Sequence, residues 1–167
     1  MVIRSHIPAP MSTHHNTIPV MNLQFSRLKE SDLPFFLEVR NRVKDKLHDS
    51  REFTLNEAIE WLPKSTTQYW IICHDLVDVG YFRLLKVSDA SWQIGADVHP
   101  DFQKQGIASK AYPAFINEII RSINPPPVSL ELRVLKNNLI ALSLYLKLGF
   151  VIQEETEIDL KMTLDLE

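Results

Sequence analysis

The segment His99–Ala111, HPDFQKQGIASKA, carries the residue types that could bind a phosphate group. It follows a strand-like run and opens an apolar helical stripe, so Gly106 falls where a strand gives way to a helix. Free backbone N–H groups at such a junction form a concave anion site, which the positive end of the helix dipole reinforces. Lys104 and Lys110 add local positive charge. The alternative is an ordinary helix N-terminus, and the glycine patterns of P-loops and dinucleotide folds are absent.

Glycine is scarce in this chain, which has four where an average chain of 167 residues would have about a dozen. We therefore expect each glycine to answer a need of the backbone. Gly106 would let a bulky anion approach the main chain, and Gly149 would cap a helix. Gly95 falls inside a strand-like run, where a glycine often marks a bulge or a close approach.

A second segment, NNLIALSLYLKLGF, begins at Asn137 and also holds residues that could do chemistry. Counted from Asn138, Ala141 lies three positions on and Tyr145 seven positions on. A phenol near a leaving thiolate could protonate it, because its ordinary pKa is near 10. The alternative is a core residue, since Tyr145 shares an apolar stripe with its helical neighbours.

Together the two segments resemble the motifs of the GNAT superfamily of N-acetyltransferases. QKQGIA fits the acetyl-CoA loop pattern [RQ]-x-x-G-x-[GA], and the second segment fits N-x-x-A-x-x-L-Y-x-x-x-G-F. The spacing of the motifs and the order of the predicted elements agree, and the resemblance covers about Leu23 to Leu166. It implies that acetyl-CoA is the cosubstrate and that an acetyl group passes to a primary amine.

The resemblance also implies roles for individual residues. The end of the preceding strand, Asp97 and Val98, would bind the pantetheine arm and polarise the thioester carbonyl. Asn138 would bind the arm from the other side, and Tyr145 would protonate the leaving thiolate. The pyrophosphate would bind the backbone of the loop residues Gln103, Lys104, Gln105, Gly106, Ile107 and Ala108. Lys104-Gln105 departs from the glycine-lysine of many members and gives a bulkier loop.

A general base is needed because an alkyl ammonium ion must lose a proton before it attacks. Asp97 and His99 alternate to the same face at a strand end, and Glu131 alternates outward on the next strand. Asp97 is the first candidate, and a chain of water molecules is the alternative to all three. The six histidines show no metal-binding spacing, so we expect no metal.

The pattern along the chain predicts a single α+β domain over residues 22–167, with a mixed, mostly antiparallel sheet flanked by helices. Strands are expected at 22–28, 128–134 and the C-terminal pair, and three strands between Gln68 and Val98 form a meander. Thr54 with Glu57 makes a capping box for a helix that ends near Pro63. Residues 1–21 show no apolar periodicity and are expected to form a poorly ordered extension.

Composition excludes several functional classes. The net charge of -3 gives no general attraction to nucleic acid or to an anionic membrane, and no apolar run is long enough to span a bilayer. The single cysteine, Cys73, is expected to be a small buried hydrophobe, and a chain without disulfides fits a reducing cytoplasm. The expected partner is a small-molecule or peptide amine, and a homodimer is left open.

The segment between the first two predicted helices, KDKLHDSREFTLNE, is expected to help form the acceptor site. Its four acidic residues could attract a cationic amine, and Lys44, Lys46 and Arg51 argue against a purely acidic pocket. Two other functions stay open. One is a catalytically silent acyl-CoA-binding module or sensor with the same fold, and the other is a protein-interaction domain without a cofactor.

Overall fold

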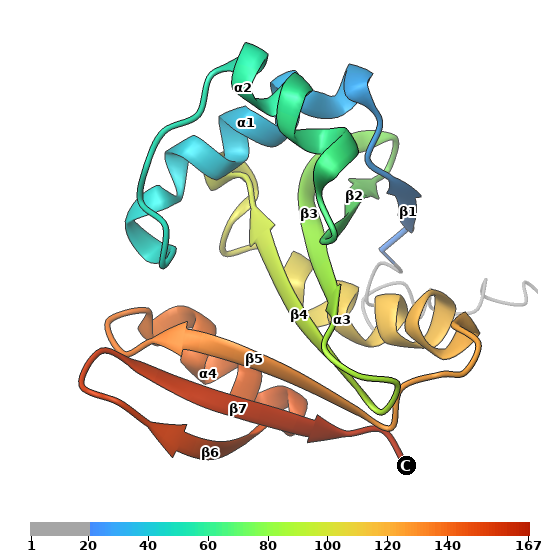
Figure 1. The fold of residues 1–167 in the computed structure, drawn as a ribbon, viewed down its shortest axis with the longest axis vertical. Helices are drawn as coiled ribbons and strands as arrows, with labels where there is room; N and C mark the ends of the chain where they lie inside the picture. Colours follow the sequence, from blue (N-terminus) through green and yellow to red (C-terminus); the bar gives the residue numbers. More distant parts are fainter. Residues whose placement is uncertain (1–20) are drawn as a thin grey trace, which may run out of the picture.

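The computed structural model describes residues 21–167, so all of the extension expected at 1–21 except Met21 lies outside the described part. The described residues form one seven-stranded sheet of order β1-β2-β3-β4-β5-β7-β6 (Figure 1). All neighbouring strands are antiparallel except β4 and β5. The strands are β1 (Leu23–Arg27), β2 (Gln68–His74), β3 (Val77–Lys86), β4 (Ser91–Val98), β5 (Ser129–Leu135), β6 (Val151–Glu155) and β7 (Asp159–Asp165).

Four α-helices flank this sheet: α1 (Leu33–Arg42), α2 (Leu55–Trp61), α3 (Ile107–Glu118) and α4 (Leu139–Leu148). The order of elements is the one that the sequence predicts, and the α+β class is confirmed. Thr54 caps α2 by accepting the N–H of Glu57 at 3.2 Å. Gly149 ends α4 with a positive φ of 99°, a conformation that glycine adopts without steric cost.

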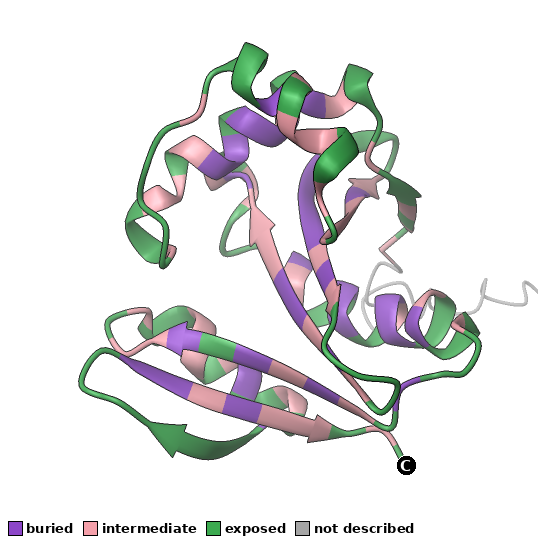
Figure 2. Cartoon of the chain, viewed as in Figure 1, coloured by how far each residue is buried: buried purple, intermediate pink, exposed green. Residues whose placement is uncertain are grey.

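Two apolar cores lie on opposite faces of the sheet. The larger packs α3 and α4 against one face, where the ring of Phe82 stacks on Phe115 with centroids 4.1 Å apart. The smaller packs α1 and α2 on the other face over β2 and β3, with Phe36 against Tyr81. Because side chains alternate along a strand, β3 sends Phe82 to the first core and Tyr81 to the second. β6 is exposed along its whole length (Figure 2).

Three local details concern the ends of α1 and the single cysteine. α1 ends at Arg42, and after Val43 the chain makes a short 3-10 turn over Lys44–Lys46. Asp32 precedes α1, and its carboxylate accepts the N–H of Lys29 at 2.9 Å and makes no hydrogen bond to an N–H group of the helix. Cys73 is half-buried rather than buried, because β2 meets β3 with a register shift at Ile72/Cys73. Partial burial raises the pKa of its thiol.

Candidate active site

The divergence of β4 from β5 opens a cleft in the described part of the chain. The two strands pair only over Ser91–Gln93 and Ser129–Glu131, and beyond this point they separate (Figure 1). The remaining edge of β4 therefore has no strand partner on that side. A cavity of about 490 Å³ extends from the divergence to the α1–α2 loop. It places Asp97, Asn138 and Tyr145, three of the residues that the sequence singles out, around one space.

The loop before α3 has the geometry of an anion site. Gly106 has a φ of 76° and Lys104 a φ of 64°, so the chain turns through two left-handed positions before the helix begins. No described residue accepts a hydrogen bond from the backbone N–H groups of residues 104–109. A Cβ built on Gly106 would meet no atom within 4 Å, so the space over this backbone is open. The loop thus fits a phosphate-bearing ligand.

The two glutamines of this loop tie it to the preceding strand. The side-chain amide of Gln103 donates to the carbonyl of Val98 at 3.0 Å, and that of Gln105 donates to the carbonyl of Asp101 at 3.4 Å. These bonds hold the loop against the end of β4. Residues 103–108 do not line the 490 Å³ cavity, so a ligand touching both would have to extend along the end of β4.

Asn138 begins α4 at the wall of the cleft. Its side-chain oxygen accepts the N–H of Ala141 at 3.4 Å, which caps the helix. The cap uses the single oxygen of the Asn138 amide, and no described residue is bonded to the NH₂ group of that amide. Asn138 therefore has donors available to a ligand while it fixes the start of the helix.

Tyr145 lies on α4, in the larger core and at the cleft wall. Its ring is 7% exposed and packs edge-on against Tyr112 with centroids 5.7 Å apart. Burial raises the pKa of the Tyr145 phenol, while the hydroxyl of Tyr112, which donates to it, opposes that effect. The phenol therefore stays protonated at neutral pH. Tyr145 is therefore both a residue of the larger core and a residue of the cleft wall.

Asp97 is the penultimate residue of β4, and its carboxylate is turned toward the α1–α2 face. Its Oδ2 accepts the hydroxyl of Tyr81 at 2.5 Å and lies 3.7 Å from Nε of Arg83. The side chain is 10% exposed and lines the cleft. A carboxylate held in this way can take a proton through Oδ1, which bonds to no described residue.

The other two candidates for the general base lie away from the cleft. His99 is buried, accepts the N–H of Asp101 at Nδ1 over 3.1 Å, and is 3.0 Å from Glu38 at Nε2. Because Nδ1 is an acceptor, the proton of the neutral ring is assigned to Nε2, which bonds to Glu38. This bond lowers the pKa of Glu38. The carboxylate of Glu131 accepts a hydrogen bond from the hydroxyl of Ser91 at 3.4 Å.

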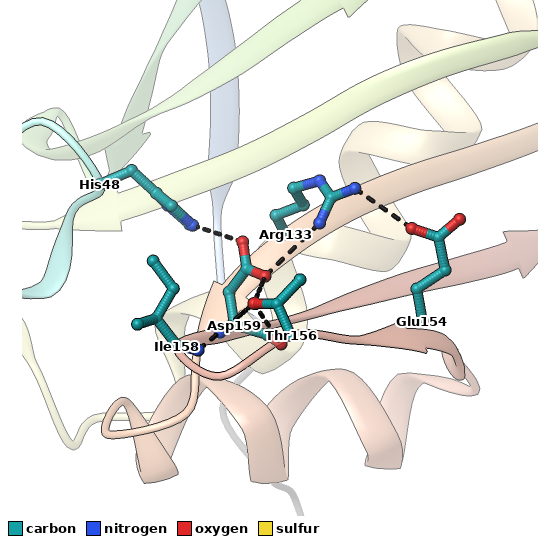
Figure 3. Close-up of polar contacts among 6 residues, drawn as sticks. All are labelled: His48, Arg133, Glu154, Thr156, Ile158 and Asp159. Carbon is teal, nitrogen blue, oxygen red and sulfur yellow. Dashed lines mark hydrogen bonds and ion pairs between the residues drawn. The ribbon is translucent and has the colours of Figure 1, made fainter.

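A cluster around Asp159 joins the α1–α2 loop to the far side of the cleft (Figure 3). His48 of that loop lies 2.9 Å from Oδ2 of Asp159 at the start of β7. Thr156 donates to Oδ1 of the same carboxylate at 2.6 Å, and Arg133 of β5 approaches it at 3.4 Å. The Thr156 hydrogen bond, and after it that of His48, lower the pKa of Asp159. The cluster closes one end of the cleft.

The cleft also contains residues that the sequence analysis does not single out. Its lining includes several aromatic residues from the α1–α2 side and Arg83 of β3. The alternation of β3, which puts an arginine two residues after Tyr81 on the same face, is the signal that could have found Arg83. The aromatic residues are Phe36, Phe53, Trp61, Tyr69 and Tyr81.

Two other kinds of feature are absent from residues 21–167. No group of three or more histidine, cysteine, aspartate or glutamate side chains is arranged to hold a metal ion. No helix in this part of the chain is long and apolar enough to cross a membrane.

Comparison with known proteins places this geometry in a family. Residues 22–151 match the sequence profile of the GNAT acetyltransferase domain. No curated protein matches the sequence. Among solved structures, N-acetyltransferase PseH of Campylobacter jejuni, in complex with acetyl coenzyme A, is 18% identical with a TM-score of 0.70. The match covers 87% of this chain and 99% of that one.

Two further solved structures are similar over nearly the same share of the chain. Spermidine N-acetyltransferase from Vibrio cholerae, in complex with CoA and spermine, is 16% identical with a TM-score of 0.72, covering 86% of this chain and 95% of its own. Ribosomal-protein-alanine N-acetyltransferase from Brucella melitensis is 17% identical with a TM-score of 0.69, and the match covers 86% of this chain and 99% of that one. At these identities the likeness extends to the fold alone.

Proposed function

Because the chain belongs to the GNAT acetyltransferase family, we propose that it transfers an acetyl group from acetyl-CoA to a primary amine of a small molecule or peptide. The observation that carries this proposal is the cleft between the diverging strands β4 and β5, which Asp97, Asn138 and Tyr145 line together. The similar structures from C. jejuni and V. cholerae, which hold acetyl-CoA and CoA, support the choice of cosubstrate.

The loop of residues 103–108 is proposed to hold the pyrophosphate of acetyl-CoA. The unpaired N–H groups of residues 104–108, the left-handed turn at Gly106 and the position of the loop before a helix of twelve residues all favour an anion there. The pantetheine arm would then extend along the free edge of β4, past Val98 and Asp97. Asn138, with a free amide group, would bind the arm from α4.

In the proposed reaction the amine nitrogen bonds to the acetyl carbonyl carbon, and the bond from that carbon to sulfur breaks. Asp97 takes the proton that the ammonium group must lose. Tyr145, whose phenol burial keeps protonated, gives its hydroxyl proton to the departing thiolate, and the proton that the attacking nitrogen loses as the amide forms restores the phenol. Main-chain groups at the end of β4 polarise the carbonyl on which negative charge develops.

The test is a panel of amines with acetyl-CoA, read by free thiol release and by the mass of the product. The panel contains polyamines, amino sugars, aminoglycosides, amino acids and peptides. Thiol release that depends on an amine, with an acetylated product, supports the proposal. Binding of acetyl-CoA without transfer to any member would favour the acyl-CoA-binding module, and no binding would favour a protein-interaction domain.

A further inference from the structure

A second cavity of about 320 Å³ adjoins the cleft and shares part of its wall. Its lining includes two arginines, Arg83 and Arg133, and contains no aspartate or glutamate. The shared wall consists of His48, Tyr69, Arg83, Arg133 and Tyr145. A ligand in the cleft could therefore extend a group into a space that favours negative charge.

Arg83 is the cation on the wall shared by both cavities whose hydrogen-bond donors are free. No described residue accepts a hydrogen bond from its guanidinium group, and its Nε is buried without a partner. The nearest carboxylate, that of Asp97, lies 3.7 Å from Nε, beyond hydrogen-bond distance. Burial favours the neutral form of the Arg83 guanidinium, and Asp97 favours its charged form; the net effect is a raised pKa of Arg83. The guanidinium is thus a positive charge at the wall of both cavities.

Gly95 explains how this guanidinium is accommodated. A Cβ at position 95 would lie 2.5 Å from Nη2 of Arg83 and 2.8 Å from Cζ, closer than real Cβ contacts allow. Gly95 is opposite Arg83 in the β3–β4 register, so the arginine side chain lies across the glycine. Because Gly95 has no side chain, the side chain of Arg83 can lie across β4 at this position.

The other arginines of the cleft already have partners, whereas Lys46, which also lines the cleft, makes no ion pair within residues 21–167. Arg40 donates to the backbone carbonyls of the α1–α2 loop, and Arg133 pairs with Asp159 and Glu154. Among these cleft arginines, Arg83 alone makes no hydrogen bond to a described residue.

The same holds for the carboxylates that could attract a polycation. Asp49 bonds to the guanidinium of Arg51 at 2.8 Å, and Glu57 accepts the hydroxyl of Thr54 at 3.2 Å. Asp97 is bonded to Tyr81. The cleft is lined by five cationic residues against these three carboxylates, which disfavours an acceptor with several positive charges.

From these contacts we propose that the acceptor amine carries an acidic group, a carboxylate or a phosphate, and that Arg83 binds it. This inference rests on the proposed acetyl transfer and narrows its acceptor. Since Asp97 and Arg83 are neighbours, the amine and the acidic group would lie close together in the same molecule. The acid takes no part in bond making, so Arg83 is a specificity-determining residue. The aromatic rings of the cleft would hold an apolar remainder of the acceptor.

The experiment compares matched amines with and without the acidic group. Phenylalanine is measured against phenethylamine, phosphoethanolamine against ethanolamine, and spermidine represents the polycations. Each acidic member is expected to show a kcat/KM about 10- to 100-fold above its partner, as expected for a charge-assisted hydrogen bond. The two acidic members then distinguish a carboxylate from a phosphate.

Variants of the arginine and of its glycine neighbour test the assignment. Arg83→Gln should bring the ratio of acidic to non-acidic kcat/KM close to one, and Arg83→Lys should keep part of it. Gly95→Ala should lower the ratio without removing the charge, because the guanidinium must move. Arg121→Gln, at an exposed arginine outside both cavities, is the matched control and should keep the ratio.

Several outcomes would overturn the inference. These are equal kcat/KM within the pairs, preference for spermidine, an unchanged ratio in Arg83→Gln, and no turnover of any acidic amine. In each case the proposed function is judged separately by binding of acetyl-CoA and by transfer to any amine. A fall in kcat/KM for both members of a pair, with the ratio kept, would mean that Arg83 is only structural.

Discussion

The hydroxyl of Tyr112 donates a hydrogen bond to the hydroxyl of Tyr145 over 3.2 Å, inside the larger core. Because Tyr112 supplies the proton of this bond, the proton of Tyr145 is free to point elsewhere. Tyr145 lines the cleft, which Tyr112 does not. Tyr112 is therefore a buried support for Tyr145, and the hydroxyl proton of Tyr145 is not used by this bond.

Tyr145→Phe separates the chemical role of this residue from its packing. Without the hydroxyl, kcat should fall about 10²-fold, the lower end for a general acid. The KM for acetyl-CoA should change little, because the lost interaction is made in the transition state. Stability should fall by about 1–3 kcal/mol, since the buried hydroxyl of Tyr112 loses its partner. Steady-state kinetics and thermal unfolding on one preparation measure both.

Tyr112→Phe is the matched control for this prediction. It removes the same hydrogen bond but leaves the Tyr145 hydroxyl in place, so kcat should stay within a few-fold of wild type. Full activity in Tyr145→Phe would refute the acid role, whatever the stability does.

Gly106→Val tests the anion site before α3. Gly106 has a φ of 76°, where a residue with a Cβ costs roughly 1–2 kcal/mol, and the new side chain would stand in the open space over the loop. We expect a KM for acetyl-CoA at least about tenfold higher, the equivalent of one lost charge-assisted hydrogen bond.

Gly149→Val places the same side chain at a φ of 99°, at the end of α4. It carries comparable backbone strain at a residue that does not line the cleft, so it should lower the melting temperature and leave the KM for acetyl-CoA unchanged. A normal KM in a folded Gly106→Val protein would be incompatible with the phosphate site.

Asp97→Asn tests the proposed base. We expect kcat to fall about 10²-fold at neutral pH, because the ammonium group has lost the carboxylate that takes its proton. The deficit should shrink as the pH rises toward the pKa of the amine, near 10.4 for an alkyl amine, where free amine is supplied by the solvent. Tyr81→Phe removes the hydrogen bond to Asp97 but keeps the carboxylate, and serves as the control. A deficit that is the same at every pH would assign Asp97 a structural role.

Asp159→Asn tests the cluster that closes the cleft. The pKa of Asp159 is lowered from its ordinary value of 3.8 in the folded chain. A lowered pKa contributes stability that is fully present above the ordinary value and is lost as the pH falls through the folded value. The variant should therefore be clearly less stable than wild type near pH 7, and the difference should shrink below about pH 4.

Denaturant unfolding at several pH values measures this difference. Asp165→Asn lies on the same strand and removes a carboxylate that makes no ion pair within residues 21–167, so it should show no such trend. A stability difference for Asp159→Asn that stays constant down to about pH 3 would contradict the assignment.

The sequence predicted the order of elements, the loop before α3 and the start of α4, because these features depend on local signals. The capping residues Thr54 and Asn138, the apolar alternation of the strands and the left-handed glycines act over a few residues each. Loop 103–108, predicted to bind an anion, has the unpaired N–H groups that such a site needs. Its binding of acetyl-CoA stays a prediction.

What could not be predicted depends on contacts between distant residues. The pairing of Arg83 with Gly95 requires the register of β3 and β4, and the contact of His48 with Asp159 joins positions 111 residues apart. The hydrogen bond of His99 to Glu38 of α1 and its position outside the lining of the cleft also needed the fold, because Glu38 comes from another element. The cleft forms because β4 and β5 diverge, and the alternation of apolar and polar residues along these strands does not indicate that divergence.

The most direct test of acetyl transfer is to incubate the protein with acetyl-CoA and the amine panel, and to quantify free CoA and acetylated amine in the same reaction. The account predicts that the two products form in equal amounts, with at least one amine, and that Tyr145→Phe slows both about 10²-fold. Acetyl-CoA that binds but is never consumed in the presence of any amine, or that does not bind at all, would contradict it.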